Sequence, residues 1–273
     1  MKTVIASFKL AGVTSLIAWI IIIQTPILWF TRGPKSYFFT RLYHAGSCKV
    51  LGLKYEVVGK PVLDQQTLYV CNHISYLDIS VIGSIIRQAS FIAKKEAREM
   101  PVYGYLSTMQ QTAFISRDRK DVKHEKNALD NMAAEGKSLI LFPEGTSTDG
   151  REVLPFKSSL FGIVLKDNIK EKMIVQPMTI SLIEANGQNP NDQDVRELYA
   201  WSREMTIPLT AHIWRLCKKK GATVRVEFHA PLTPTEFKDR KALAKAAEEK
   251  TAAGLYIPNT NQDTGLDSKA KAA

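Results

Sequence analysis

The sequence is poor in the residues that build disulfide frameworks and metal clusters. Only 3 cysteines occur among the 273 residues, at positions 48, 71 and 217, and no two of them have C-x-x-C spacing. Their number and spacing exclude a disulfide scaffold, a zinc ribbon and a thioredoxin-type redox site. The 5 histidines include no H-x-x-x-H pair, so the sequence predicts no metal site.

Charge is missing from one long stretch near the N-terminus. No charged residue occurs between Lys9 and Arg32, and the run Ala11–Phe30 would be about 30 Å long as a helix, the thickness of a bilayer core. A secretory signal peptide would need a shorter apolar core and a small-residue cleavage site, and a soluble helix is rarely apolar on all sides. The run therefore predicts a membrane anchor, either spanning or re-entrant.

Basic residues outnumber acidic ones by 37 to 27, and the formal net charge is +10. Such an excess fits either nucleic acid or an anionic membrane surface. The anchor favours the membrane, and the short basic run Lys218–Lys220 lacks the interleaved aromatics of a nucleic-acid site, so no nucleic-acid partner is expected. Four basic residues follow the apolar run and two precede it, which places the main domain on the cytoplasmic side of the inner membrane.

Changes of composition divide the chain into three parts. Residues 1–49 hold the anchor and a segment, Ser36–Lys49, that fits either an interfacial amphipathic helix or a helix packed on the main domain. Residues 50–258 alternate short apolar runs with longer helical ones, which predicts an α/β domain with a single sheet flanked by helices on both faces. Residues 259–273 are small and polar, and we expect a disordered tail.

The second half of the α/β region carries three local predictions. Glu184–Glu204 is polar and contains Gly and Pro, so it predicts a surface loop or lid. A helix is expected over Lys157–Lys166. Thr233 precedes a proline that suits the first helical position, which predicts a C-terminal helix over Pro234–Ala253.

Polar residues directly follow the strand predicted over Leu68–Cys71. His73 and Asp78 are five residues apart, so they cannot share one face of a regular helix. They can meet if His73 lies in the turn and Asp78 in the first helical turn, with the carboxylate accepting from Nδ1 and Nε2 left as a base. No nucleophile accompanies them, because G-x-S-x-G is missing and Ser75 is too near in sequence. The alternative is a helix-capping Asp78 and a loop histidine.

A second motif, FPEGT, follows the apolar strand predicted over residues 138–142. Pro143 would end the strand, Gly145 would permit a tight turn, and Glu144 would put a carboxylate at the carboxyl end of the strand. By itself the motif is equally typical of a plain strand-ending turn.

Two further residues mark strand positions. Arg117 closes the run Phe114–Arg117 at the end of a predicted strand, where its planar fork could hold a phosphate or carboxylate, or could simply be part of a solvated charge run. Pro177 lies within the strand predicted over Ile174–Ser181, which predicts an edge strand or a bulge.

The order and spacing of these motifs are more specific for a protein family than any one motif alone. NHxSxxD from Asn72, F-I-x-R ending at Arg117, FPEGT ending at Thr146 and V-x-P ending at Pro177 together resemble the glycerophospholipid acyltransferase family, over about residues 55–180. The family includes bacterial lysophosphatidic acid acyltransferases. The resemblance implies transfer of an acyl chain from acyl-CoA or acyl-carrier protein to the free hydroxyl of a lysolipid in membrane lipid biosynthesis, with no further cofactor.

The same resemblance implies the roles of individual residues. His73 would be the general base and Asp78 its orienting partner, so that the acyl chain passes directly to the substrate hydroxyl without an acyl-enzyme. The residues implied to bind the acceptor head group are Lys95 or its neighbour Lys94, Arg117, Glu144, Gly145, Thr146 and Lys157. Those implied to hold the loop or shape the pocket are Asn72, Pro143 and Pro177.

Departures from the family pattern bear on the acceptor. Ser147 stands where many lysophosphatidate enzymes have an arginine that contacts the phosphate, and Ser116 replaces a common Asp. A phosphate monoester prefers arginine forks, so the loss weakens the expectation of lysophosphatidate. The stretches Gly145–Gly150 and Leu154–Ser158 are more similar to family members that acylate lyso-ornithine lipids. Both acceptors stay open, and a thioesterase on the same fold is a further alternative.

Overall fold

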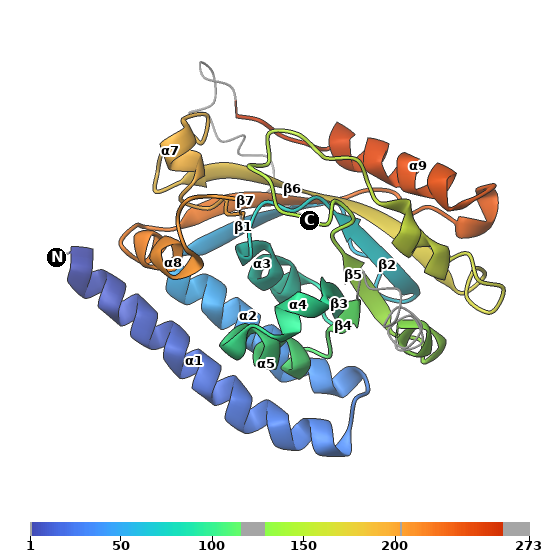
Figure 1. Ribbon diagram of the computed structural model, residues 1–273, viewed down its shortest axis with the longest axis horizontal. Helices are drawn as coiled ribbons and strands as arrows, with labels where there is room; N and C mark the ends of the chain where they lie inside the picture. The colour runs from blue at the N-terminus through green and yellow to red at the C-terminus, as the bar shows by residue number, and fades with distance from the viewer. Residues whose placement is uncertain (1, 116–128, 203, 259–273) are drawn as a thin grey trace, which may run out of the picture.

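The computed structural model describes residues 2–115, 129–202 and 204–258. Seven strands form one sheet in the order β1-β7-β6-β2-β5-β3-β4 (Figure 1). The strands are β1 (Leu53–Val58), β2 (Gln66–Cys71), β3 (Ala89–Lys94), β4 (Ala113–Ile115), β5 (Ser138–Leu141), β6 (Met173–Ala185) and β7 (Ala222–Phe228). All neighbouring pairs are parallel except β6 and β7, so the sheet is mixed.

Helices cover both faces of this sheet, which confirms the predicted fold class. One face carries α1 (Lys2–Phe30), α2 (Tyr37–Leu51), α3 (Leu77–Ile85), the short α4 (Lys95–Arg98), α5 (Pro101–Met109) and α8 (Leu209–Cys217), and the other carries α9 (Arg240–Ala253) (Figure 1). Shorter elements are α7 (Gln193–Arg196) and the 3-10 turns at Pro34–Ser36, Ser158–Ile163 and Pro234–Glu236. Residues 129–134 are also helical.

Alternating side chains of the central strands fill two separate cores. In β2, Tyr69 and Cys71 pack with α3 and α8, while Leu68 and Val70 pack with α9 and the 3-10 turn at Ser158–Ile163. Successive strand residues point to opposite faces, and a parallel strand covered on both faces is apolar throughout. The sheet therefore holds its central strands rigidly, and their carboxyl ends meet at one edge.

The segment after the apolar helix α1 is part of the folded domain. Helix α2 packs against α1 and α3 and buries His44, Cys48 and Leu51. This packing fits the second alternative for Ser36–Lys49, and the exposed Phe38 and Leu42 leave an apolar outer face for the first. Gly52 ends the helix in the left-handed conformation, with φ of 78°, and its amide donates to Lys49.

Pro177 contradicts the prediction of an edge strand or a bulge. Its strand, β6, lies between β2 and β7, and the irregular register occurs near Glu184 instead. The proline is tolerated at the end of the β7 ladder, where His229 N still donates to Pro177 O. The side-chain amide of Gln176 donates to His229 O at 3.1 Å and so replaces the N–H that proline lacks.

One predicted helix starts later than expected, and another is wrong. The C-terminal helix begins at Arg240, because Asp239 accepts hydrogen bonds from Lys241 N and Ala242 N and thus caps it, while Thr233 makes no side-chain cap. The expected helix Lys157–Lys166 is a 3-10 turn over Ser158–Ile163 followed by turns. The predicted tail, 259–273, lies outside the described residues.

Candidate functional site

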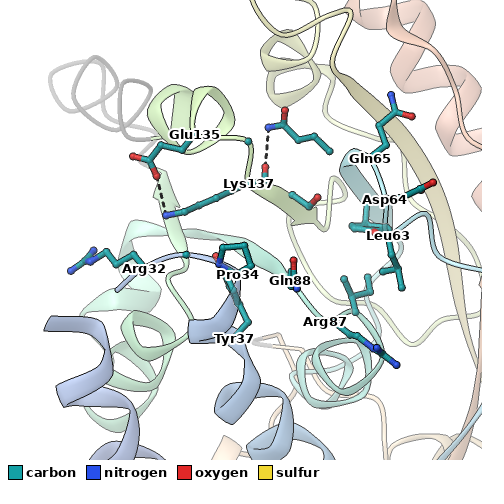
Figure 2. A pocket seen from close by; sticks show the side chains of 16 residues that line it. Arg32, Pro34, Tyr37, Leu63, Asp64, Gln65, Arg87, Gln88, Glu135 and Lys137 are labelled. Carbon is teal, nitrogen blue, oxygen red and sulfur yellow. Dashed lines mark hydrogen bonds and ion pairs between the residues drawn. The ribbon is translucent and has the colours of Figure 1, made fainter. Parts of the chain in front are cut away.

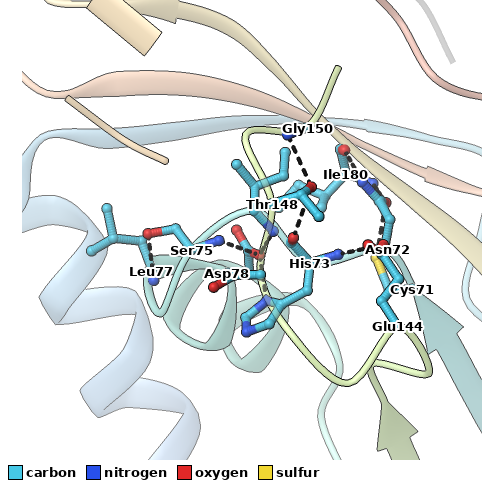
Figure 3. Close-up of polar contacts among 12 residues, drawn as sticks. Cys71, Asn72, His73, Ser75, Leu77, Asp78, Glu144, Thr148, Gly150 and Ile180 are labelled. Carbon is cyan, nitrogen blue, oxygen red and sulfur yellow. Dashed lines mark hydrogen bonds and ion pairs between the residues drawn. The ribbon is translucent and has the colours of Figure 1, made fainter. Parts of the chain in front are cut away.

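The predicted contact between His73 and Asp78 is present at the carboxyl end of β2 (Figure 3). His73 lies in the turn after the strand, and Asp78 lies in the first turn of α3. His73 Nδ1 and Asp78 Oδ2 are 2.8 Å apart, and the same oxygen accepts from Ile74 N at 2.7 Å and Ser75 N at 2.9 Å. The carboxylate is fully buried and fixes the tautomer of the imidazole, with the proton on Nδ1 and the lone pair on Nε2.

Tyr199 completes the shell of donors around this carboxylate. Its hydroxyl donates to Asp78 Oδ1 at 2.8 Å, so both oxygens of the buried group are satisfied. Burial, followed by the charge of Asp78, holds the pKa of Tyr199 well above its usual value, which keeps the phenol protonated as a donor. The prediction of a surface loop or lid over Glu184–Glu204 is therefore wrong in this part, because Leu198–Ala200 is buried. These apolar residues within a polar stretch were the signal for the buried segment.

Asn72 ties the loop to the neighbouring strand. Its side-chain amide donates to Ile180 O at 2.9 Å, and its side-chain oxygen accepts from Ile180 N at 2.8 Å. The side chain is fully buried, so this double hydrogen bond fixes where the strand β2 ends relative to β6. This placement agrees with the loop-holding role that the resemblance implies.

Glu144 holds the backbone of His73 and does not line the cavity beside that histidine. Its Oε1 accepts from His73 N at 3.1 Å, the residue is 2% exposed, and Oε2 has no hydrogen-bond partner among the described residues. Burial raises the pKa of Glu144 to about 8, which keeps the carboxyl largely protonated near neutral pH. Thr148 N donates to His73 O at 2.8 Å, so the EGT segment holds both backbone groups of the histidine. The geometry favours a positioning role over the implied contact with the acceptor.

A largely apolar cavity of about 630 Å³ opens beside His73. Helices α1, α2, α3 and α5, strand β3 and the EGT turn all contribute to its walls. Of the residues predicted for the site, those that line it are His73, Gly145 and Thr146, together with Lys94 in place of Lys95, and Ser147. The imidazole stacks on Phe142 with ring centroids 4.1 Å apart, which orients its edge at the rim of the cavity.

The remaining predicted residues lie close to the EGT turn. Pro143 begins the turn, and its carbonyl accepts from Lys157 N at 3.0 Å. Gly145 has φ of 71°, and a Cβ there would lie 2.6 Å from Lys157 Nζ, so the glycine leaves room for the lysine. Ser147 Oγ donates to Trp201 O at 2.8 Å. Arg117 lies outside the described residues.

The site combines an oriented imidazole with a cysteine that is not activated. Burial, reinforced by the charges of Asp78 and Glu144, raises the pKa of the Cys71 thiol well above its usual value, so it carries no reactive thiolate. No group of three or more His, Cys, Asp or Glu that could hold a metal ion occurs within residues 2–115, 129–202 and 204–258. The arrangement can deprotonate a hydroxyl brought to His73 Nε2.

Several known proteins similar to this chain are acyltransferases. A family model described as Acyltransferase matches residues 54–181. The chain is 35% identical over 208 residues to the lyso-ornithine lipid O-acyltransferase of Rhodobacter capsulatus, with 76% of this chain and 71% of that protein covered. It is 30% identical over 199 residues to the 1-acyl-sn-glycerol-3-phosphate acyltransferase of Neisseria meningitidis, with 72% of each covered.

A solved structure shares the fold. The crystal structure of the 1-acyl-sn-glycerophosphate (LPA) acyltransferase PlsC from Thermotoga maritima superposes with a TM-score of 0.64 at 20% identity, over 93% of this chain and 96% of that one. The residues matched by the family model include His73, Asp78, the EGT turn and Pro177. The chain therefore belongs to the acyltransferase family.

Proposed function

We propose that this protein transfers an acyl chain from acyl-CoA or acyl-carrier protein to the free hydroxyl of a lyso-ornithine lipid at the membrane. The single observation that carries the proposal is the fixed imidazole of His73, 2.8 Å from a buried carboxylate and at the rim of an apolar cavity. No described residue makes a hydrogen bond to Nε2, so this nitrogen can accept the proton of a substrate hydroxyl.

The step that fits this geometry is direct acyl transfer. His73 Nε2 takes the hydroxyl proton while the hydroxyl oxygen attacks the thioester carbonyl; the new C–O bond forms, the C–S bond breaks, and the imidazolium returns the proton to the leaving thiolate. Asp78 stabilises the imidazolium and keeps the ring in place. General-base catalysis of this kind contributes about 10²–10⁴-fold. The inert Cys71 thiol is consistent with the lack of a covalent acyl-enzyme.

The cavity has the dimensions of one acyl chain. Along α2 it is lined from Thr40 to Leu51, which spans roughly 16 Å at about 1.5 Å per residue. That length is close to half of a bilayer core of about 30 Å, the depth of one lipid leaflet. An acyl chain could therefore pass from the membrane into the cavity with its reacting end beside His73.

Helix α1 fits an anchor that lies along the membrane surface. It is long and apolar enough to cross a bilayer, but it is tied to the domain at two points, about 22 Å apart along the helix. Lys9 Nζ donates to Lys219 O at 2.9 Å, and Gln24 Nε2 donates to Met109 O at 3.2 Å. The exposed Phe8 and Trp29 are three heptads apart, so they lie on the same side of the helix, the side that would enter the lipid.

Two observations bear on which lysolipid accepts the acyl chain. Ser147 holds the carbonyl of Trp201 in place of the arginine fork expected for a phosphate, and the Rhodobacter relative is named for lyso-ornithine lipid. A second candidate, lysophosphatidate, is favoured by Lys157, whose ammonium lies against Gly145 at the EGT turn, and by the name of the Neisseria relative.

An acceptor panel tests the proposal. Purified protein in mixed micelles would receive lyso-ornithine lipid, lysophosphatidate or other lysophospholipids, each with labelled acyl-CoA or acyl-carrier protein. We expect the highest kcat/KM with lyso-ornithine lipid. A higher kcat/KM with lysophosphatidate would show that lysophosphatidate is the acceptor instead. Thioester hydrolysis without acylation of any lipid would overturn the proposal in favour of a thioesterase.

A further inference from the structure

One wall of the apolar cavity is polar. The α2 residues that line it are Thr40, Tyr43, His44, Ser47 and Leu51, which share one face of the helix, and four of these five carry a polar group. The α1 wall opposite is formed by Val13, Ile17 and Ile20. A site for a plain hydrocarbon chain would not need the polar stripe on α2.

Two atoms of this stripe are buried without a partner. His44 Nδ1 and Ser47 Oγ make no hydrogen bond to any residue within the described ranges, and the two residues are 4% and 3% exposed. The phenol of Tyr43 interacts with the Ser47 hydroxyl without reaching hydrogen-bond geometry. Because buried polar atoms are nearly always satisfied in folded proteins, these two indicate a missing ligand group.

The state of His44 is set by its surroundings. Nε2 lies 2.9 Å from Gln110 Oε1, and because an amide oxygen only accepts, Nε2 carries the proton and Nδ1 is a bare acceptor. Burial lowers the pKa of His44 to about 4, so the ring is neutral near pH 7. A Cβ at Gly83 would lie 2.6 Å from His44 Cδ2, so the packing of α2 on α3 keeps the ring from turning to another partner.

We propose that His44 and Ser47 form a subsite that binds a hydroxyl group carried by an acyl chain in the cavity. A hydroxyl both donates and accepts: it would donate to His44 Nδ1 and accept from the Ser47 hydroxyl, which lies one helical turn away. The inference rests on the proposed function, because it takes the cavity as the site of an acyl chain. The chain that bears the hydroxyl can belong to the acyl donor or to the lysolipid acceptor.

The test compares hydroxylated and plain chains in the full-length protein. Palmitoyl-CoA would be compared with monohydroxypalmitoyl-CoA carrying the hydroxyl at successive positions, and in a second arm the hydroxyl would be on the chain of the lysolipid. We expect one position in one arm to be preferred by about 3- to 10-fold in kcat/KM, the effect of one well-placed hydrogen bond. The arm that shows the preference identifies the source of the chain.

Ser47→Ala should abolish this preference, measured within the variant as the ratio of kcat/KM for the hydroxylated and the plain chain. Ser80→Ala is the matched control, because Ser80 lines the same cavity from α3 and should leave the preference intact. The proposal is overturned if no position in either arm is preferred, or if Ser80→Ala removes the preference as fully as Ser47→Ala does.

Binding separates this inference from the proposed function. The shift in Tm on adding hydroxypalmitate or palmitate to the protein reports the subsite without any catalysis. A larger shift with hydroxypalmitate, lost in Ser47→Ala, would support the subsite even if no lipid were acylated. Equal shifts with both acids, for every hydroxyl position, would overturn the subsite even if the protein proved an efficient acyltransferase.

Discussion

Two cavities of similar volume lie at opposite ends of the sheet, and only one has the chemistry of a catalytic site. The cavity beside His73, about 630 Å³, lies at the carboxyl ends of β2, β3 and β5. The other, about 690 Å³, lies at the amino ends of the same strands, and no histidine is among the residues that line it (Figure 2). Volume alone would not distinguish them.

The difference lies in how the polar groups are satisfied. At the amino ends, several polar groups are already paired: Lys137 Nζ lies 3.0 Å from Glu135 Oε2 (Figure 2). Gln66 Nε2 donates to Ala133 O and Lys137 O. At the carboxyl ends, the loop that leads from β2 into α3 folds back over the helix start, and the loop amides of Ile74 and Ser75 hold Asp78. The turn into α3 thus holds an imidazole in a fixed orientation beside an apolar cavity, and the second cavity has no such group among the residues that line it.

The largest expected effect is at His73. His73→Ala should lower kcat by at least about 100-fold, because the base that takes the hydroxyl proton is gone. Gln88→Ala, at an exposed position of the second cavity, is the control and should change kcat by less than about 2-fold. Initial rates and circular dichroism of the purified proteins check both. Near-wild-type turnover in His73→Ala, or a stable acyl adduct on Ser75 or Cys71, would contradict the mechanism.

Ser147→Arg tests whether residue 147 in the cavity beside His73 faces the head group of the acceptor. The added guanidinium offers a fork to a phosphate and repels the ammonium of an ornithine head group, so kcat/KM for lysophosphatidate relative to lyso-ornithine lipid should rise about tenfold. Gln88→Arg adds the same charge at the second cavity and should leave that ratio unchanged. An unchanged ratio in Ser147→Arg would show that this position does not face the head group, although it lines the cavity.

Tyr199→Phe tests the support of the base. Removing the hydroxyl leaves Asp78 Oδ1 without its donor, and we expect a loss of about 1–3 kcal/mol in the free energy of unfolding and a several-fold lower kcat. Tyr37→Phe is the matched control, because Tyr37 lines the second cavity and its hydroxyl lies 2.7 Å from Ser90 Oγ. This substitution should lower the free energy of unfolding but leave kcat unchanged. Equal losses of kcat in both variants would argue against a positioning role for Tyr199.

Glu144→Gln gives the smallest effect on rate and a distinct effect on pH dependence. The pKa of Glu144 is about 8 in the folded protein and 4.5 in a model peptide, so between these values the native state binds more protons than the unfolded state. Its contribution therefore lowers the free energy of unfolding as the pH rises from 4.5 to 8, by at most about 1.4 kcal/mol per pH unit.

In Glu144→Gln the decrease in the free energy of unfolding between pH 4.5 and 8 that is due to Glu144 should vanish, while the side-chain oxygen can still accept from His73 N. Urea denaturation at pH 5, 6, 7 and 8 measures how the free energy of unfolding depends on pH. Glu135→Gln, at an exposed carboxylate of the second cavity, should keep the wild-type slope. If Glu144→Gln kept that slope too, the carboxyl would not be protonated in the folded protein.

The linear pattern of the chain was enough for the motifs and the fold class. Apolar runs that end in polar turns predicted the strands β2 and β5, and the five-residue spacing predicted that His73 and Asp78 could meet only across a turn. These features are local, because a strand followed by a helix start involves fewer than about ten consecutive residues.

Apart from the two helix boundaries, the errors occurred where distant segments meet. Pro177 was expected at an edge, but its missing N–H is replaced by Gln176, a substitution that depends on where β7 ends. Tyr199 was taken as part of a loop, although its hydroxyl reaches Asp78 from 121 residues away. Glu144 was expected to face the acceptor and is instead buried under His73.

The sequence by itself therefore determined the class of fold, the long apolar helix at the N-terminus and the pairing of His73 with Asp78. The tertiary structure decided which buried groups hold that carboxylate, which way Glu144 points and where the cavity beside His73 carries polar atoms. The physical reason is that hydrophobic periodicity and turn chemistry act between near neighbours, while burial and the pairing of buried polar groups depend on every segment packed around them.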